Sequence, residues 1–186
     1  TNPTALAFGY PGSKIAETDH WLILVRPKQP TFGSLVLVCK ETVQAFSEVS
    51  PAAFADLQVA VAGIERLLKA QVDYEKINYL MLMMVDKDVH FHVLPRYEGA
   101  REHEGQSFPD AGWPAAPALG NAVALSSEGV ERLAQQREVG VAFDASGARP
   151  RNIHGLNSGS PDCTTWASGV ISVTAGMQPG SGCDET

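Results

Sequence analysis

The stretch Asp88-Val-His-Phe-His-Val-Leu-Pro-Arg96 is the most informative segment of this chain. Its alternating pattern predicts a β-strand, because successive side chains of a strand point to opposite faces. Pro95 lacks a backbone donor and is expected to end the strand, which leaves Arg96 beside the same face as the histidines. The alternation predicts one face with Val89, Phe91 and Val93, and another with Asp88, His90, His92 and Leu94.

The segments before this stretch predict two buried strands and a long helix. Trp21 to Val25 and Leu35 to Cys39 are continuous apolar runs, and the turn formers between them suit a hairpin-like connection. A helix is expected to begin at Ser50-Pro51, an N-cap followed by proline at the first helical position. Spacing of three and four residues predicts its apolar face, made of Phe54, Leu57, Val61, Ile64 and Leu68.

Two further elements and a tail are expected. Ile77 to Val85 is strongly apolar and predicts a strand that turns at Asp86-Lys87 into the histidine strand. A short helix is predicted from Ser127 to about Gln136. Residues 137–186 include eight glycines, one leucine and no lysine, which is typical of a loosely ordered Gly/Ser-rich tail. The chain is therefore divided into a domain over residues 1–136 and a C-terminal tail over 137–186.

The composition is that of an ordinary globular protein, with 44% hydrophobic and 19% charged residues. The formal net charge of -7 opposes non-specific binding to duplex nucleic acid. Leu80 to Val85 is the longest apolar run, far short of the roughly 18 residues of a membrane-spanning helix. Without a signal-peptide pattern, a cytoplasmic location is expected. Cys39, Cys163 and Cys183 are too widely spaced to predict a disulfide framework or a structural zinc site.

Two histidines on one strand face admit three interpretations. They could be ordinary core or surface histidines, or metal ligands with Asp88, His20 or His103 as the third ligand. They could also be catalytic, because an imidazole can attack phosphorus and leave again from a phosphoramidate. A second imidazole on that face could donate a hydrogen bond to phosphate oxygens. Three cations could offset phosphate charge: Arg26, Lys28 and Arg96.

The order of these elements resembles the histidine-triad (HIT) superfamily, whose signature is His-φ-His-φ-His-φ-φ with φ apolar. The resemblance covers residues 14–97, through strand, glycine, strand, long helix, strand, tight turn and His90-Phe-His92-Val-Leu-Pro-Arg96. It implies an α+β, HIT-like fold with an antiparallel sheet of about five strands, one long helix and a short second helix. It also implies a homodimer. Gly33 and Asn78-Tyr79 stand where similar members of the family carry them.

Two positions depart from the family pattern. Asp88 replaces the first histidine of the triad, and Met83-Met84 replaces a polar Gly-Asn pair that nucleotide-hydrolysing relatives often carry. A carboxylate at position 88 could hold a neighbouring imidazole and raise its basicity, although its charge would repel a polyphosphate. The segment from Phe108 to Pro114 resembles bacterial members that also carry aspartate at the first triad position, which indicates a bacterial-type variant.

The resemblance implies a nucleotide hydrolase or nucleotidyl transferase acting at the α-phosphate of a nucleoside 5′-phosphate derivative. A dinucleoside polyphosphate or a phosphoramidate would react through a nucleotidyl-histidine intermediate. His90 is expected to attack phosphorus, His92 to stabilise the phosphate oxygens, and Asp88 to orient a histidine or water. The expected substrate-binding residues are Arg96, Arg26, Lys28 and Asn78. No cofactor is expected, although a divalent cation could accompany a polyphosphate.

Two alternatives remain open from the sequence. The domain could be a nucleotide-binding module that lost turnover through Asp88 and Met84. Less favoured is a metal site built from His90, His92 and Asp88.

Overall fold

The computed structural model describes residues 2–138. All but the first two residues of the predicted tail, 137–186, lie outside this part, so the tail and the division at residue 136 stay predictions. Within residues 2–138, no helix is long and apolar enough to cross a membrane.

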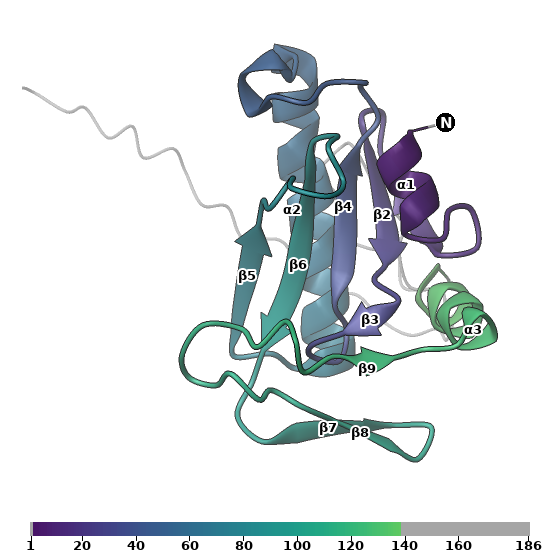
Figure 1. Cartoon of the computed structure of the whole chain (residues 1–186), viewed down its shortest axis with the longest axis vertical. Coiled ribbons are helices and arrows are strands. Elements are labelled where there is room, and N and C mark those ends of the chain that lie inside the picture. Colours follow the sequence, from purple (N-terminus) through teal and green to yellow (C-terminus); the bar gives the residue numbers. More distant parts are fainter. Residues whose placement is uncertain (1, 139–186) are drawn as a thin grey trace, which may run out of the picture. The chain divides into compact units, whose positions relative to one another are not determined.

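A five-stranded antiparallel sheet of order β1-β2-β4-β6-β5 forms the centre of the domain (Figure 1). The two apolar runs predicted as core strands are its second and third strands, and all their residues are buried. The predicted α+β class with an antiparallel sheet of about five strands is therefore confirmed. The five strands are β1 (Lys14–Glu17), β2 (Trp21–Val25), β4 (Leu35–Cys39), β6 (His90–Arg96) and β5 (Lys76–Leu80).

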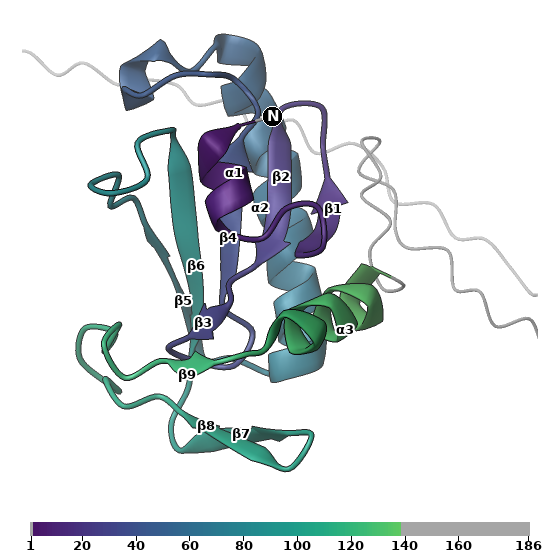
Figure 2. The ribbon, with the colours of Figure 1, turned by 45° about the vertical axis from the view of Figure 1, so that its right-hand side comes forward.

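Helix α2 (Pro51–Val72) covers one face of this sheet, behind the strands in Figures 1 and 2. Ser50 caps it as predicted, because its side-chain oxygen accepts a hydrogen bond from the Ala53 N–H at 3.1 Å. This bond satisfies one of the N–H groups that the first turn of any helix leaves free.

The apolar face of α2 differs in part from the prediction. Ile64 and Leu68 are fully buried as expected, but Phe54 is 41% exposed. The first turns instead meet the sheet through alanine, and the Ala53 carbonyl accepts a hydrogen bond from Trp21 Nε1 at 2.8 Å. A small side chain lets the helix backbone come this close, so the bulky Phe54 points outward.

Gly33, in the turn before β4, lies under the C-terminal end of α2. Its φ of +92° is in the left-handed region that favours glycine. A Cβ atom here would come within 2.7 Å of Val72 Cγ2. Both the backbone conformation and the space therefore require glycine.

A short helix, α1 (Pro3–Ala7), lies on the opposite face of the sheet (Figure 2). It was not predicted, although Asn2-Pro3 is the same start signal as Ser50-Pro51: Asn2 Oδ1 accepts from the Ala5 N–H at 3.2 Å. Five residues are too few for a hydrophobic period to be visible. The helix contributes to a second buried cluster made of Ala5, Leu22, Leu24, Val36 and Val38.

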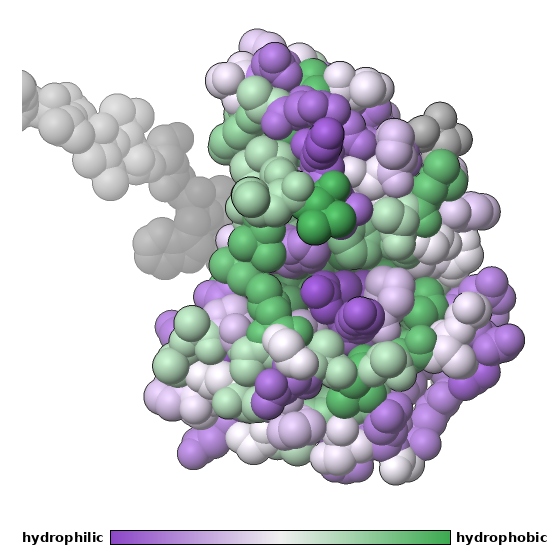
Figure 3. Space-filling view, in the orientation of Figure 1, coloured by the Kyte–Doolittle hydropathy of each residue, from purple (hydrophilic) through white to green (hydrophobic). Residues whose placement is uncertain are grey.

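The predicted strand Ile77–Val85 is wrong in its second half, because β5 ends at Leu80. Met83 has a φ of +38°, which an extended strand does not allow. Met84 and Val85 are 85% and 89% exposed, so the end of this apolar run is a surface loop. Figure 3 shows hydrophobic surface along the β5 side of the molecule, next to hydrophilic groups in the middle of the face.

Strand β6 continues through Pro95 to Arg96, contrary to the predicted end at the proline. β4 pairs with β6 only as far as Leu35 opposite Val93, so Pro95 has one neighbouring strand. The Arg96 carbonyl faces β5, where it accepts from the Glu75 N–H at 2.9 Å. The nitrogen of Pro95 faces the other way, where no strand needs a donor.

The two small ribbons and the final helix surround the lower end of the sheet in Figure 1, and a 3₁₀ turn precedes α2 at the upper end. The final helix begins at the predicted residue and extends two residues past the predicted end. These elements are the ribbon of β3 (Lys28–Gln29) with β9 (Val123–Ala124), the ribbon of β7 (Ala100–His103) with β8 (Gln106–Pro109), the 3₁₀ turn η1 (Phe46–Glu48) and helix α3 (Ser127–Glu138).

A buried ion pair joins the end of β6 to the loop after β8. Arg96 Nε and Nη2 donate to the two carboxylate oxygens of Asp110 at 2.6 and 3.1 Å, and the two side chains are 5% and 1% exposed. Asp110 also accepts from the N–H groups of Tyr97 and Gly112, and Arg96 Nη2 donates to the Ala115 carbonyl. The loop is thus held by groups that are polar yet buried.

Replacing Asp110→Ala should destabilise the domain by about 3–5 kcal/mol, because the Arg96 charge would stay buried without its partner. Urea unfolding of the variant and the wild type measures the difference. Glu104→Ala is the matched control: it removes an ion pair with Arg132 at 3.2 Å whose side chains are about half exposed. The control should leave stability nearly unchanged. Equal effects of the two substitutions would contradict a structural role for the buried pair.

Candidate functional site

The two histidines of β6 lie side by side on the face that carries α1. His90 pairs with Val38 and His92 with Val36, two residues of the cluster under α1. The imidazole centroids are 5.0 Å apart with an interplanar angle of 86°, and both residues are buried. The prediction that they share a face is confirmed.

His90 is oriented by the backbone. Its Nδ1 lies 2.7 Å from the carbonyl oxygen of Asp88. A carbonyl can only accept, so we assign the ring proton to Nδ1. In the neutral ring the lone pair is then on Nε2, which is the form that a nucleophilic imidazole needs.

His92 has the opposite arrangement. Arg26 Nε donates to His92 Nδ1 in a long hydrogen bond of 3.4 Å. Because a guanidinium can only donate, Nδ1 is the acceptor and the proton is on Nε2. Burial, and then the charges of Arg26 and His90, lower the pKa of His92 to about 4. Near neutral pH, His92 is therefore a neutral N–H donor beside the lone pair of His90.

The Asp88 carboxylate contacts helix α1 and makes no hydrogen bond to either imidazole. Thr4 donates to Asp88 Oδ2 twice, from its hydroxyl at 2.9 Å and from its N–H at 3.3 Å. The expected role of this carboxylate was to orient a histidine or water; in the structure the contact with His90 comes from the Asp88 carbonyl. Asp88 precedes the first residue of β6, so strand alternation does not set the direction of its side chain.

Phe8, directly after α1, contacts both imidazoles. Its ring centroid is 5.8 Å from that of His90 and 5.7 Å from that of His92. Sequence reasoning missed this residue, because its place in the site depends on α1. The Asn2-Pro3 start signal could have indicated the helix, but nothing local indicates its contact with β6.

The four predicted substrate-binding residues lie in different surroundings. Arg26 is half-buried beside His92, and burial lowers the pKa of its guanidinium. Lys28 is exposed, and its carbonyl accepts a hydrogen bond from Arg26 Nη1. Arg96 donates to Asn78 Oδ1 at 2.8 Å, so both belong to the buried network of Asp110. Among these four residues, Arg26 is the cation that the structure brings to the histidines.

The Asp88 carboxylate bonds to Thr4, and it makes no hydrogen bond to His90 or His92. Within residues 2–138, no three His, Cys, Asp or Glu side chains gather as a metal site. His20 lies 3.4 Å from Glu41, and His103 stacks on Phe32, so neither supplies a third ligand.

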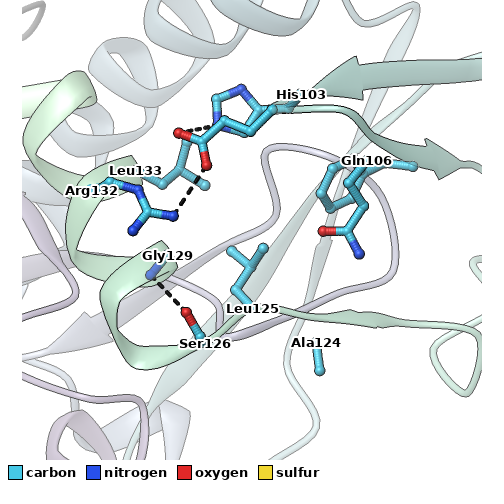
Figure 4. Close-up of a pocket in the computed structure, with 10 residues that line it drawn as sticks. His103, Gln106, Ala124, Leu125, Ser126, Gly129, Arg132 and Leu133 are labelled. Atoms are coloured by element: carbon cyan, nitrogen blue, oxygen red, sulfur yellow. Dashed lines mark hydrogen bonds and ion pairs between the residues drawn. The ribbon is translucent and has the colours of Figure 1, made fainter.

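A separate pocket of about 130 Å³ lies between the β7–β8 ribbon and α3 (Figure 4). His103, Glu104 and Arg132 line it, and the last two form an exposed ion pair. No histidine of β6 contributes to it, so the pocket belongs to another part of the domain.

Residues 9–99 match the family model described as HIT domain. No curated protein sequence matches the chain. A histidine triad (HIT) protein from Sinorhizobium meliloti has a similar structure, with 22% identity, a TM-score of 0.55, and coverage of 69% of this chain and 88% of that chain. A hypothetical histidine triad nucleotide-binding protein from Sulfolobus tokodaii is also similar, with 16% identity, a TM-score of 0.52, and coverage of 73% of this chain and 87% of that chain.

The diadenosine triphosphate hydrolase of Plasmodium falciparum is also similar in structure. The identity is 11%, the TM-score is 0.51, and the alignment covers 69% of this chain and 76% of that chain. At these identities the solved structures show a shared fold.

The pKa of His92 predicts a loss of stability in acid. An unfolded histidine takes up a proton near pH 6.5, whereas folded His92 does so only near pH 4. The contribution of His92 to the free energy of unfolding is therefore present above about pH 6.5 and is lost as the pH falls to about 4. The loss is on the order of 3 kcal/mol. Urea unfolding across this range should show a shallower pH dependence for His92→Asn. Parallel curves for the two proteins would contradict a buried, neutral His92.

Proposed function

We propose that this chain, whose HIT domain match and fold support a place in the histidine-triad superfamily, is a nucleotide hydrolase or nucleotidyl transferase. It would act at the α-phosphate of a nucleoside 5′-phosphate derivative, such as a dinucleoside polyphosphate or a phosphoramidate. One observation carries the proposal: His90 presents a lone pair and His92, beside it, presents an N–H group. Phosphoryl chemistry needs both a nucleophile and a donor to the phosphate oxygens.

In the first step, Nε2 of His90 attacks the α-phosphorus. A new P–N bond forms to His90; in a dinucleoside polyphosphate the P–O bond to the leaving phosphate breaks and that phosphate takes the electron pair, whereas in a phosphoramidate the P–N bond to the amine breaks and the amine takes the electron pair and a proton from solvent. The positive charge on the nucleotidyl-imidazole is stabilised at Nδ1–H by the carbonyl of Asp88, 2.7 Å away. Water then attacks phosphorus and releases a proton to solvent, the P–N bond breaks with its electron pair returning to Nε2, and a nucleoside monophosphate leaves as His90 is restored.

His92 and Arg26 would act on the phosphate oxygens. As a neutral imidazole with its proton on Nε2, His92 donates to a non-bridging oxygen without exchanging a proton. Arg26 remains charged at all relevant pH values and supplies positive charge next to His92. Arg96 and Asn78 would support the site indirectly, through the ion pair with Asp110 that holds the loop after β8.

A binding module without turnover is the second candidate. The loop after β5 favours it, because Met83 and the exposed Met84 replace polar residues that could contact a phosphate or ribose. It predicts that calorimetry with a panel of nucleoside mono- and polyphosphates detects binding, while chromatography of the same mixtures detects no product. Absence of binding across the panel would eliminate this candidate.

Removal of the nucleophile tests the hydrolase. His90→Ala should lower release of nucleoside monophosphate from a dinucleoside polyphosphate at least about a thousandfold. His92→Ala should lower kcat by about 10²–10³, the effect of losing one donor to a developing oxyanion, and His92→Gln should restore part of it.

Intact-mass measurement after rapid acid-free quenching should find a nucleotidyl adduct in the wild type and none in His90→Ala. His20→Ala is the control, because this histidine lies at the β1–β2 turn next to Glu41, away from the site. Undiminished turnover in His90→Ala would overturn the proposal.

A further inference from the structure

We infer that Asp88 is a positioning residue that acts through helix α1: its carboxylate holds Thr4, and α1 in turn places Phe8 against both imidazoles. The role differs from that of a triad histidine, since the carboxylate is turned away from the reacting atoms. Its consequence for turnover rests on the proposed function, whereas its consequence for the histidines does not.

Asp88 and Thr4 are 84 residues apart in sequence and make three hydrogen bonds. Besides the two bonds to Oδ2, the Asp88 N–H lies 3.3 Å from the Thr4 hydroxyl. Both residues are buried, with 4% and 2% of their surface exposed. A buried carboxylate needs such donors, and bonds to a charged group are stronger than those between neutral groups.

The contact also satisfies the first turn of α1. The leading N–H groups of a helix have no partner within the helix, and they favour a negative charge nearby. Asp88 accepts from Thr4, and Asn2 accepts from Ala5. A helix of five residues is not stable alone, so α1 depends on contacts outside itself. The other anchors are the bond from Asn2 Nδ2 to the Cys39 carbonyl and the buried side chain of Ala5.

Phe8 connects helix α1 to the two histidines. It directly follows the last residue of α1, and its N–H bonds to the carbonyls of Thr4 and Ala5. Its half-buried ring covers one side of both His90 and His92. Burial is the main cause of the low pKa of His92, and in this inference the Phe8 ring, which contacts the imidazole, supplies part of that burial.

The experiment compares variants along this chain of contacts. Thr4→Val removes the hydroxyl with little change of shape, Thr4→Ser keeps it, and Phe8→Ala removes the ring. Thr18→Val is the matched control, because it removes a threonine-to-aspartate bond of 2.6 Å, to Asp56, elsewhere in the domain. The readout is the pH titration of the imidazole resonances of His92 by NMR.

Thr4→Val and Phe8→Ala should both shift the titration midpoint of His92 upward from about 4 toward 6.5, since water then reaches the ring. Thr4→Ser and Thr18→Val should keep the wild-type midpoint. Thermal melts identify any variant that does not fold, and Phe8→Ala, at a half-buried position, tests the last step independently of Thr4.

Two results would overturn the inference. An unchanged titration midpoint of His92 in Phe8→Ala would show that the Phe8 ring does not set the pKa of this histidine. A shift in Asp88→Asn together with none in Thr4→Val would show that the carboxylate acts on the imidazoles directly.

Turnover separates this inference from the proposed function. If the wild type hydrolyses a dinucleoside polyphosphate, Thr4→Val should lower kcat on the order of tenfold or more, as small misplacements in active sites do, with less effect on KM. If the wild type turns over neither dinucleoside polyphosphates nor nucleoside phosphoramidates, the proposed function fails. The NMR titration still decides whether Asp88 positions α1 and Phe8.

Discussion

Strand β6 pairs with β4 on one side and with β5 on the other, and this double pairing sets the direction of the side chains it carries. Val93 packs in the main core together with residues of α2, while His90 and His92 face α1. Because neighbouring side chains point to opposite faces, a slip of one residue would turn both histidines toward α2. The burial that stabilises the sheet therefore also places the two imidazoles together.

Polar groups buried on the histidine face connect it to distant parts of the chain. Arg96 requires Asp110, from the loop after β8, and Asp88 requires Thr4, from α1. An unpaired charge in such a place costs several kcal/mol, so the folded domain needs both segments in position. The Asp88–Thr4 contact also fixes α1, from which Phe8 reaches both imidazoles, so this contact links the stability of the domain to the shape of its site.

The two histidines are chemically identical, and their neighbours make them different. A carbonyl acceptor at Nδ1 leaves a lone pair on Nε2 of His90, whereas the Arg26 donor leaves a proton on Nε2 of His92. Burial keeps His92 neutral, so it can donate a hydrogen bond without giving up or gaining a proton. In the proposed reaction this difference separates nucleophile from phosphate donor, although the motif is simply His-Phe-His.

The local sequence pattern predicted the elements that have a clear apolar period or a clear start signal. Alternation along residues 88–96 predicted a strand with His90 and His92 on one face, and Ser50-Pro51 predicted the start of α2. The local sequence pattern failed where the end of a strand or the partner of a side chain depends on residues distant in sequence. Nothing near Met83 indicates that the ladder stops at Leu80, and nothing near Asp88 indicates Thr4. A carboxylate or guanidinium takes the donor or acceptor that folding brings to it, so only the tertiary structure decided that Arg96 pairs with Asp110 and that Asp88 holds α1.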